Sequence, residues 1–444
     1  MNMKCFITNE AKKEYWKEVV LKEGASQDCM HVVNVYPSFQ RQVIEGFGGA
    51  FTEAATYTFS KLPQKEQEEI LEAYFGESGL RYNMGRCHIH SCDFALGNYT
   101  YVEENDETLE SFDIAHDRDN MIPMIRRAME KAQDDLIILS SPWSPPAYMK
   151  TNGEMNHGGK LKEEYRRLWA EYVAKYVQAY RAEGIPVRYI TVQNEPEAVQ
   201  TWDSCVYTAK EEGDFVRDYL ADALKKAGLD DLGIFIWDHN KEAAFDRADA
   251  TLSDSDTAAL VTGVALHWYT GDHFDALRLI REKYPEKRLF FTEGCVEYSR
   301  FSDSGEVQKA EMYAHDMIGN LKAGVEACLD WNLLLDEKGG PNHVGNFCAA
   351  PIMCDVSAGT VEKRLSYYYI GHLSRFVKRG ARLIATTAYT DKVEAAAFLN
   401  PDGERVVVLL NKTEGEVEVT LRENGAGTQL ILPAHAIATA IYRQ

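Results

Sequence analysis

The sequence predicts an α/β protein, a (β/α)8 TIM barrel with an appended antiparallel β-sandwich built from both chain ends. Residues 44–380 alternate short apolar runs with longer amphipathic ones. Eight such alternations favour a closed barrel over a doubly wound sheet. Short strand-like runs with turn signals fill residues 381–444, and residues 1–43 also lack a helical period.

The eight apolar runs are the predicted barrel strands. They span residues 44–51, 80–90, 136–142, 188–194, 233–238, 263–269, 288–293 and 325–335. The first run, "IEGFGGAF", is rich in glycine, and we expect its glycines to give room for close packing.

Amphipathic segments between these runs are the predicted helices, among them residues 63–75, 120–132 and 163–184. The third keeps apolar residues at the i, i+3, i+4, i+7 spacing of a helix with one buried face. It stops at Gly184, which we expect to cap its carboxyl end.

We expect three parts in the chain. Residues 1–43 contribute strands to the sandwich, residues 44–380 form the catalytic barrel, and residues 381–444 complete the sandwich. The turn Asn400-Pro-Asp-Gly403 separates two of the late strands. The early runs "KCFITN" and "MHVVNVYP" are expected to pair with the late strands.

Composition excludes several kinds of partner. The formal net charge of -21 argues against nucleic acid and against anionic membrane surfaces. The chain has no apolar run of about 18 residues, so we expect no membrane insertion. The first residues show no signal peptide, and the nine cysteines show no paired CxxC spacing. These features predict a reduced, cytoplasmic protein, and they give no indication of its oligomeric state.

Two glutamates follow predicted barrel strands. Strand four ends in Asn194-Glu195 and strand seven in Glu293. Because active sites of such barrels lie at the carboxyl ends of the strands, we expect the two carboxyl groups to face each other. Paired carboxyl groups cleave glycosidic bonds. Pro196 is expected to hold the turn that presents Glu195, and Glu197 is interpreted as a charge in the first turn of a following helix.

Other strand ends carry aromatic and polar residues that suit a sugar. Asp93 follows strand two, Trp143 strand three, His267 and Tyr269 strand six, and Trp331 strand eight. Aromatic faces complement the apolar faces of a sugar ring, and Asp and Asn bind its hydroxyls. Both tryptophans are equally suited to the core.

Histidines offer a competing interpretation. His88 and His90 lie two apart on one strand, and His239, His267 and His273 are available to complete a metal site. The alternative is that His88 and His90 are hydrogen-bonded core residues. Asp330 lies inside strand eight, where a metalloenzyme barrel needs an aspartate at the strand end. We therefore predict no metal and no cofactor.

Seven motifs together resemble glycoside hydrolase family 30, and within it the lysosomal glucosylceramidase type. They are "EGFGGAFTEAA", "SCDF", "SPWSPPAYMKTNG", "QNEPE", "HWY", "FTEGC" and "DWNLLLDEKGGPNHVGNF". They occur in the family's order along nearly the whole barrel. The resemblance implies the same two-part fold and retaining hydrolysis of β-linked sugars.

The resemblance also implies roles for individual residues. Glu195 would be the general acid/base, Glu293 the nucleophile, and Asn194 the partner of the sugar 2-hydroxyl. The implied sugar-pocket residues are Asp93, Trp143, His267, Tyr269, Trp331 and Asn346. The chain departs from the glucosylceramidase type at Tyr148 and His343, on loops that would shape the aglycone side.

We expect a β-glucoside or another β-linked saccharide as substrate. The acid role requires a proton on Glu195, so burial and the charge of Glu293 are expected to raise its pKa. Carboxyl groups about 5–5.5 Å apart are expected for a retaining enzyme. β-1,6-Glucanase, β-xylosidase and β-fucosidase activities stay open, although Asp93 favours glucose over xylose. From other classes, a catalytically silent carbohydrate-binding protein and a metal-dependent hydrolase also stay open.

Overall fold

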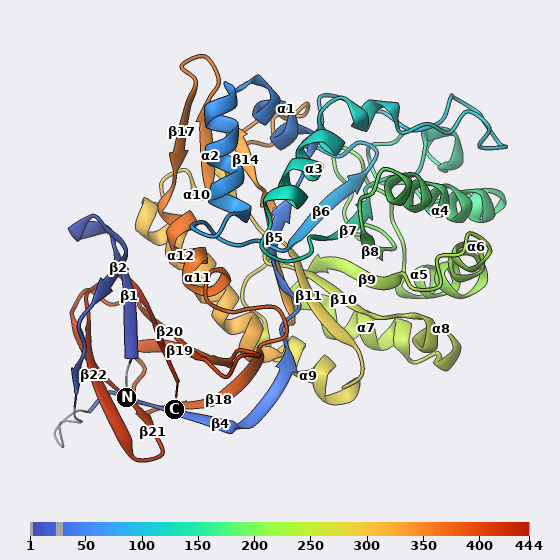
Figure 1. The fold of residues 1–444 in the computed structure, drawn as a ribbon. Helices are drawn as coiled ribbons and strands as arrows, with labels where there is room; N and C mark the ends of the chain where they lie inside the picture. The colour runs from blue at the N-terminus through green and yellow to red at the C-terminus, as the bar shows by residue number, and fades with distance from the viewer. Residues whose placement is uncertain (1–2, 24–29, 444) are drawn as a thin grey trace.

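The structure is a computed structural model that describes residues 3–23 and 30–443. It confirms the predicted fold class, a parallel eight-stranded barrel beside a β-sandwich that contains both ends of the chain (Figure 1). Each predicted barrel strand is present. The strands are β5 (Gly46–Ala50), β6 (Met84–Ile89), β7 (Ile137–Pro142), β8 (Val187–Thr191), β9 (Gly233–Asn240), β10 (Gly263–His267), β11 (Arg288–Glu293) and β13 (Ala327–Asn332).

Parallel pairing of β13 with β5, from Ala327 opposite Gly46, closes the barrel. Glycine is needed in β5 because a Cβ on Gly48 would lie 2.1 Å from the carbonyl oxygen of Met84. The lower barrel interior is apolar, with side chains such as Met84, Phe235 and Phe290 in contact. Arg86 lies two residues after Met84 on β6, so it points into the same interior one layer higher. The barrel therefore changes from an apolar core to a polar floor towards the carboxyl ends of its strands.

Helices surround the barrel in the order expected of alternating units. They are α1 (Glu53–Lys61), α2 (Gln64–Phe75), α3 (Met121–Lys131), α4 (Arg166–Ala182), α5 (Ala209–Phe215), α6 (Ala221–Lys226), α7 (Ala244–Leu252), α8 (Ser255–Leu260), α9 (Phe274–Lys283), α10 (Tyr298–Phe301), α11 (Glu306–Ala323) and α12 (Leu365–Ser374). The three helices predicted from periodicity correspond to α2, α3 and α4. Gly184 follows α4 with φ +81° and donates its N–H to the Arg181 carbonyl, as expected of a capping glycine.

Shorter elements connect these units. A π-helical turn, Val216–Leu220, joins α5 to α6, and single 3-10 turns lie at Glu10–Lys12, Ala115–Arg118, Ala147–Met149, Glu163–Tyr165 and Lys241–Ala243. Small strands between β11 and α12 are β12 (Val296–Glu297), β14 (Leu334–Asp336), β15 (Cys348–Ala349), β16 (Ile352–Asp355) and β17 (Thr360–Lys363). Pairing of β12 with β15 brings the loop after β11 against the loop after β13 at the mouth of the barrel.

The sandwich combines early and late strands. Its strands are β1 (Met3–Asn9), β2 (Glu14–Val19), β3 (Lys22–Glu23), β4 (Val32–Val43), β18 (Arg382–Ala388), β19 (Val393–Leu399), β20 (Arg405–Asn411), β21 (Val417–Glu423), β22 (Ala426–Leu432) and β23 (Ala436–Tyr442). β1 pairs with β23 along its whole length, and β4 pairs with β18, as predicted. One pair differs from the antiparallel expectation, because β21 runs parallel to β4. β4 runs antiparallel to β18 along one edge. Along its other edge β4 pairs with β21, which belongs to a hairpin with β22.

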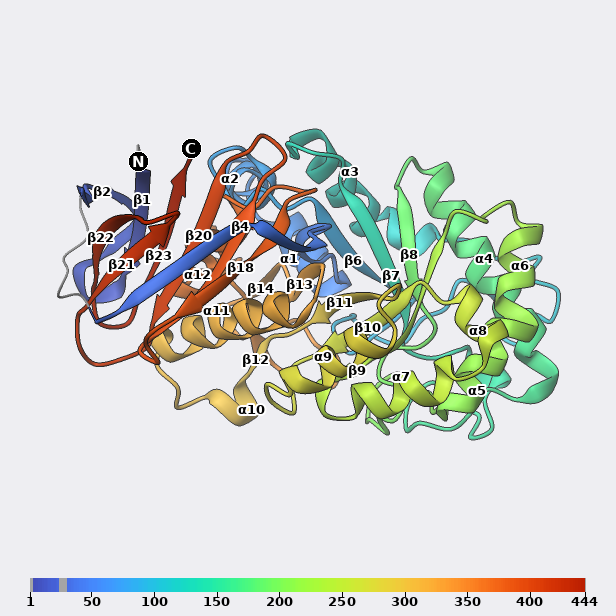
Figure 2. The same cartoon turned by 90° about the horizontal axis from the view of Figure 1, so that it is seen from below.

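The sandwich packs on the barrel through α11 and α12 (Figure 2). The buried His372 on α12 links the two ends of the chain, since its ring nitrogens lie 2.9 Å from the hydroxyls of Thr8 and Thr439. Its burial lowers the pKa to about 3. The junction therefore depends on a neutral imidazole rather than on a charge.

The same junction contains a histidine that carries charge. His315 on α11 lies 2.7 Å from Glu394 on β19 and 2.9 Å from Asp272, and the Glu394 contact raises the pKa of the imidazole. Such a histidine stabilises the fold below its unfolded pKa of about 6.5, and the stabilisation is lost as pH rises through the folded pKa. We expect His315→Gln to cost about 1 kcal/mol at pH 6.

That loss corresponds to an unfolding midpoint lower by roughly 1–2 °C in a chain this long. The difference in midpoint between variant and wild type should be smaller at pH 9 than at pH 6, because the wild type loses the charge as pH rises through the folded pKa of His315. Scanning calorimetry at both pH values tests this, with His273→Gln as the exposed control. An equal deficit at both pH values would contradict the assigned charge.

The predictions on membrane-spanning segments and on the cysteines can also be compared with the structure. In the described part of the chain, no helix combines the length and apolarity needed to cross a bilayer. The eight cysteines in that part are free and buried, as expected of small apolar side chains, and Cys29 lies outside the described residues.

Candidate active site

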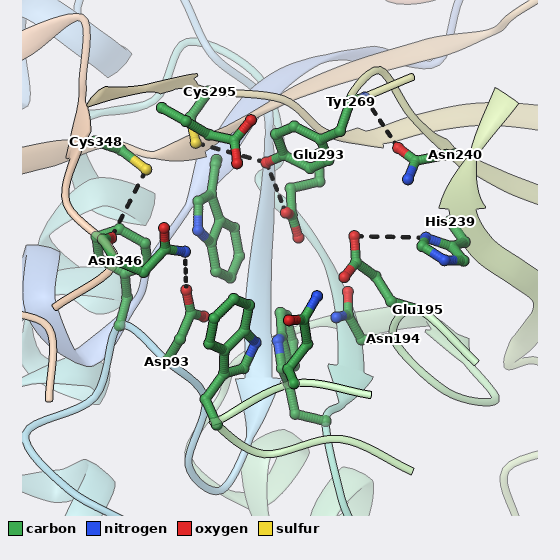
Figure 3. A pocket seen from close by; sticks show the side chains of 16 residues that line it. Asp93, Asn194, Glu195, His239, Asn240, Tyr269, Glu293, Cys295, Asn346 and Cys348 are labelled. Carbon is green, nitrogen blue, oxygen red and sulfur yellow. Dashed lines mark hydrogen bonds and ion pairs between the residues drawn. The ribbon is translucent and has the colours of Figure 1, made fainter. Parts of the chain in front are cut away.

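A small pocket of about 150 Å³ opens at the carboxyl ends of the barrel strands (Figure 3). Eight of the nine predicted site residues line it, and the ninth, His267, lies buried beneath it against Glu195. The lining residues are Asp93, Phe94, Trp143, Asn194, Glu195, Gln200, Trp202, His239, Asn240, Tyr269, Glu293, Cys295, Glu297, Trp331, Asn346 and Cys348. The structure thus brings together all nine predicted site residues, from six strands of the barrel and the loops after them.

Glu293 ends β11 with both carboxylate oxygens engaged. Arg86 Nη1 donates to Oε2 at 2.5 Å, and the Tyr269 hydroxyl donates to Oε1 at 2.8 Å. The two donors come from β6 and from the loop after β10, so they fix the carboxylate from two sides. A carboxylate held in this way is oriented for attack on an atom in the pocket.

Arg86 organises the floor of the pocket and was missed in the sequence. Besides Glu293, its guanidinium donates to Asn194 Oδ1 and to Asp238 Oδ2, each at 2.8 Å. Burial of the guanidinium lowers the pKa of Arg86, but the charges of Asp238 and Glu293 outweigh this effect and raise it. Removing one partner of such a buried charge pair costs about 3–5 kcal/mol, because the other charge is left uncompensated. An arginine within the predicted barrel strand 80–90 was the available signal.

Asp238 is the second residue that sequence reasoning overlooked. It lies within β9 in a left-handed backbone conformation, φ +45°, and its carboxylate accepts from Arg86, Ser141, Thr191, Thr292 and His267. These contacts hold its pKa well below the usual range despite complete burial. An aspartate closing the fifth predicted strand, "GIFIWD", was a signal of the kind used for the other strands.

Glu195 is presented by a strained turn. Its φ is +47°, a region that non-glycine residues rarely adopt, and two backbone hydrogen bonds hold it there. Its N–H donates to the Asp238 carbonyl at 3.0 Å, and its own carbonyl accepts from the N–H of Ala198 at 2.9 Å. This turn, with Pro196 inside it, directs the Glu195 carboxyl group into the pocket, as expected from the sequence.

The expectation that Glu195 has a raised pKa is wrong for the protein without substrate. Burial alone would raise the pKa, but His239 and His267, 3.5 and 3.2 Å from Oε1, lower it below the usual range. His267 behaves in the opposite way. Burial disfavours its charge, yet Glu293, Asp238 and Glu195 raise its pKa to about 9. In the free protein the proton shared by Glu195 and His267 therefore resides on the imidazole.

The opposite wall of the pocket is suited to hydroxyl groups. Asn346 donates to Asp93 Oδ2 at 3.1 Å, and burial together with the charge of Glu293 raises the pKa of Asp93 to about 8. Figure 3 shows Asp93 and Asn346 on one side of the two glutamates, and His239 and Asn240 on the other. A carboxyl group that is neutral at pH 7 donates one hydrogen bond and accepts others, which matches a sugar hydroxyl.

Trp143 and Trp331 stack on each other with ring centroids 5.2 Å apart and also contact the Arg86 guanidinium. They are buried and they line the pocket, so the core and pocket interpretations both hold for them. Glu197 begins no helix, because the chain continues as a loop until α5, and its carboxylate lies 3.1 Å from Arg247.

His88 and His90 do not form a metal site. The Glu53 N–H donates to His88 Nε2, and the other ring nitrogen contacts the His90 carbonyl. Both nitrogens of His90 contact Tyr172 and the Ser144 carbonyl, and burial lowers the pKa of the two histidines to about 4 and about 3. His273 is exposed and contacts the Thr270 carbonyl. The metal interpretation is wrong for His88 and His90, which are hydrogen-bonded core residues.

The two positions that depart from the glucosylceramidase type are absent from the lining of the described pocket. The Tyr148 hydroxyl donates to the Asp106 carbonyl at 2.5 Å. His343 lies 3.9 Å from Asp203, the neighbour of the lining residue Trp202.

An eight-stranded barrel with two glutamates in a small, aromatic-walled pocket at its strand ends defines a glycoside hydrolase. Family models agree. The glycosyl hydrolase family 30 TIM-barrel domain matches residues 44–377, and the family 30 beta sandwich domain matches residues 380–440. The chain belongs to glycoside hydrolase family 30.

Individual relatives carry two kinds of name. Putative glucosylceramidase 3 of Caenorhabditis elegans is 33% identical over 96% of this chain and 84% of its own length. An endo-1,6-beta-D-glucanase of Neurospora crassa is 31% identical over 90% of this chain and 85% of its own length. The crystal structure of SrfJ from Salmonella typhimurium is 39% identical and superposes with a TM-score of 0.96 over the whole of both chains.

Proposed function

We propose that the protein is a retaining β-glycosidase that acts on β-linked glucosides, with Glu293 as nucleophile and Glu195 as general acid/base. The arrangement of the two glutamates carries this proposal. One carboxylate is held at both oxygens by Arg86 and Tyr269, and the other shares a proton with His267. A nucleophile needs fixed orientation, and an acid/base needs a proton that can move.

In the first step a Glu293 oxygen attacks the anomeric carbon while the bond to the leaving oxygen breaks. Glu195 gives its proton to that oxygen, and His267 supplies the proton that Glu195 lacks in the free protein. In the second step Glu195 takes a proton from water, the water oxygen attacks the anomeric carbon, and the bond to Glu293 breaks. Glu195 then passes the proton taken from water back to His267, so both carboxyl groups and the imidazole return to their starting state. The sugar leaves with its original configuration.

The charge of the site supports this chemistry. Arg86 and His267 face Asp238, Glu195 and Glu293, so the acidic groups exceed the basic ones around the anomeric carbon. A surplus of negative charge in a buried pocket stabilises an oxocarbenium-like transition state. Asn194, held by Arg86, is placed to bind the 2-hydroxyl.

The size of the pocket supports a single glycosyl ring as the bound group. Its volume of about 150 Å³ is below the roughly 300–1,000 Å³ of sites for drug-sized ligands. Asp93 and Asn346 favour glucose, because a hydroxyl at C4 or C6 can bind them, whereas xylose has no C6 hydroxyl. Gln200, Trp202 and Asn240 also line the pocket and offer polar and aromatic groups that suit a sugar or small glycoside as leaving group.

Hydrolysis of aryl β-glycosides tests the proposal. Among the glucoside, xyloside, fucoside and galactoside, we expect the glucoside to be cleaved fastest and Glu293→Gln to cleave none. Activity that survives in Glu293→Gln would overturn the assignment. The relationship to endo-1,6-β-glucanases favours one second candidate, hydrolysis within a β-1,6-glucan. Release of oligosaccharides from that glucan, with no cleavage of the aryl glucoside, would establish the second candidate instead.

The pH dependence of kcat/KM should be bell-shaped, with its alkaline limb near pH 9. The alkaline limb reports loss of the proton that Glu195 and His267 share. This proton resides on the imidazole of His267, whose pKa is about 9. Initial rates with an aryl β-glucoside from about pH 4 to 10 measure it, and His267→Gln should move the limb to lower pH. An alkaline limb near pH 5 in the wild type would show that Glu195 titrates as an isolated carboxyl group.

We also propose a cytoplasmic location. The eight free cysteines of the described part support a reducing compartment. Cell fractionation of the native host tests this, and recovery of the protein outside the cell would contradict it.

A further inference from the structure

The carboxyl group of Glu195 lies between two imidazoles. Glu195 Oε1 is 3.2 Å from His267 Nδ1 and 3.5 Å from His239 Nδ1, and one donor atom from each of the three residues lies within 4.8 Å of the other two. His239 Nδ1 is buried and makes no hydrogen bond within the described part of the chain. Its one ionic contact, with Glu195, is longer than a good hydrogen bond, so the bonding capacity of this buried nitrogen is largely unused and calls for an explanation.

The triangle has the dimensions of a tetrahedral metal site. Zn²⁺ binds histidine nitrogen and carboxylate oxygen at about 2.0–2.2 Å, so two ligands of one tetrahedral ion lie about 3.3–3.5 Å apart. Two edges of the triangle already have such lengths. Asp238 Oδ1, 3.0 Å from His267 Nε2, provides the outer carboxylate that orients a metal-binding histidine.

The remaining ligand position faces the pocket, because Glu195 and His239 both line it. Figure 3 shows the His239 ring directed at the Glu195 carboxylate, with no other labelled side chain between them. Water from the pocket can therefore complete the coordination. Two imidazoles and one carboxylate select Zn²⁺, Co²⁺ or Ni²⁺ over Mg²⁺ and Ca²⁺, which prefer oxygen ligands.

We propose that Glu195, His239 and His267 form an inhibitory site for Zn²⁺ and similar divalent transition metals. Binding of the ion releases to solvent the proton that Glu195 and His267 share, and the ion then occupies the lone pair of Glu195 that has to accept and release this proton. The carboxylate then serves neither as acid nor as base, and hydrolysis stops until the ion leaves. Metal binding itself rests only on the geometry of the three residues, whereas inhibition rests on the proposed function of Glu195.

Binding of Co²⁺ to the full-length protein tests the site directly, because the visible absorption of four-coordinate Co²⁺ reports its ligands without any substrate. We expect one Co²⁺ per chain, displaced by Zn²⁺, with no thiolate-to-metal band in the near ultraviolet. His239→Gln and, separately, Glu195→Gln should each weaken binding at least about tenfold. His273→Gln, an exposed histidine outside the pocket, is the matched control and should bind as the wild type does.

Isothermal titration with Zn²⁺ and the rate with an aryl β-glucoside complete the test. Saturating Zn²⁺ should reduce the rate at least about tenfold, and a chelator should restore it. Absence of Co²⁺ binding at millimolar concentration, a thiolate band, or equal affinity in His239→Gln would overturn the site. Binding that depends on His239 in a protein without glycosidase activity would preserve the site and overturn the proposed function. An active enzyme that binds no metal would overturn the site and preserve the proposed function.

Discussion

Glu293→Gln is expected to reduce kcat for an aryl β-glucoside by at least about 10⁴-fold, since loss of a covalent nucleophile removes the whole pathway. In transition-state terms that is about 5.5 kcal/mol. The amide retains the shape of the side chain and the contact with Tyr269, but it cannot form the glycosyl ester. It also removes the charge that Arg86 neutralises, so the buried guanidinium loses one of its two anionic partners.

Folding has to be separated from chemistry in this variant. Circular dichroism and the unfolding midpoint show whether the variant folds. Glu286→Gln, which changes an exposed glutamate in the turn before the same strand, is the matched control. The control should retain full activity. A folded Glu293→Gln with more than about one tenth of the wild-type kcat would remove Glu293 from the mechanism.

Glu195→Ala is expected to reduce activity by about 10²–10⁴-fold, the usual contribution of general acid/base catalysis. The loss depends on the leaving group. A glucoside with an acidic phenol needs little protonation, so its first step should be nearly normal. A disaccharide has a poor leaving group, so its cleavage should show the largest loss, about 10⁴-fold. The second step lacks its base in both cases, and the glycosyl-enzyme should accumulate.

Azide should rescue the second step, because this small nucleophile needs no base and fits the space left by the carboxyl group. The product should be the β-glucosyl azide. Rates with a dinitrophenyl glucoside, with and without azide, measure the rescue. Glu197→Ala, two residues away and paired with Arg247, is the control and should keep its activity and ignore azide. Equal losses for good and poor leaving groups would argue against Glu195 as the acid.

The fold was largely predictable because each barrel strand is a short apolar run, and periodicity reports such runs directly. Pairing of the early with the late strands was also predictable, since both ends of the chain carry short strand-like runs outside the barrel. The parallel contact of β21 with β4 was not, because strand direction in a sandwich depends on which edge a hairpin reaches. No local pattern in residues 417–423 encodes that edge.

The position of the site was predictable for a similar reason. Glu195, Glu293 and Trp143 lie at or shortly beyond the carboxyl ends of their strands, so the topology alone brings them to one end of the barrel. Asp238 ends the predicted run 233–238 and was overlooked among the strand ends, whereas Arg86 lies within a strand, where a charged residue is noticed only if its buried partners are known. The pKa of Glu195 was predicted in the wrong direction for the same reason. The sequence shows the charge of Glu293 but not the two imidazoles that contact Glu195.

The expected double displacement has one direct test, which is to trap and locate the covalent intermediate. A 2-deoxy-2-fluoro-β-glucoside with a good leaving group should form the glycosyl-enzyme faster than water can release it, because the fluorine destabilises both transition states. Intact mass and peptide mapping of the full-length protein then identify the modified residue. A double displacement predicts one added glycosyl group, on Glu293. A group on another residue, or an active enzyme that releases the inverted anomer and forms no adduct, would contradict it.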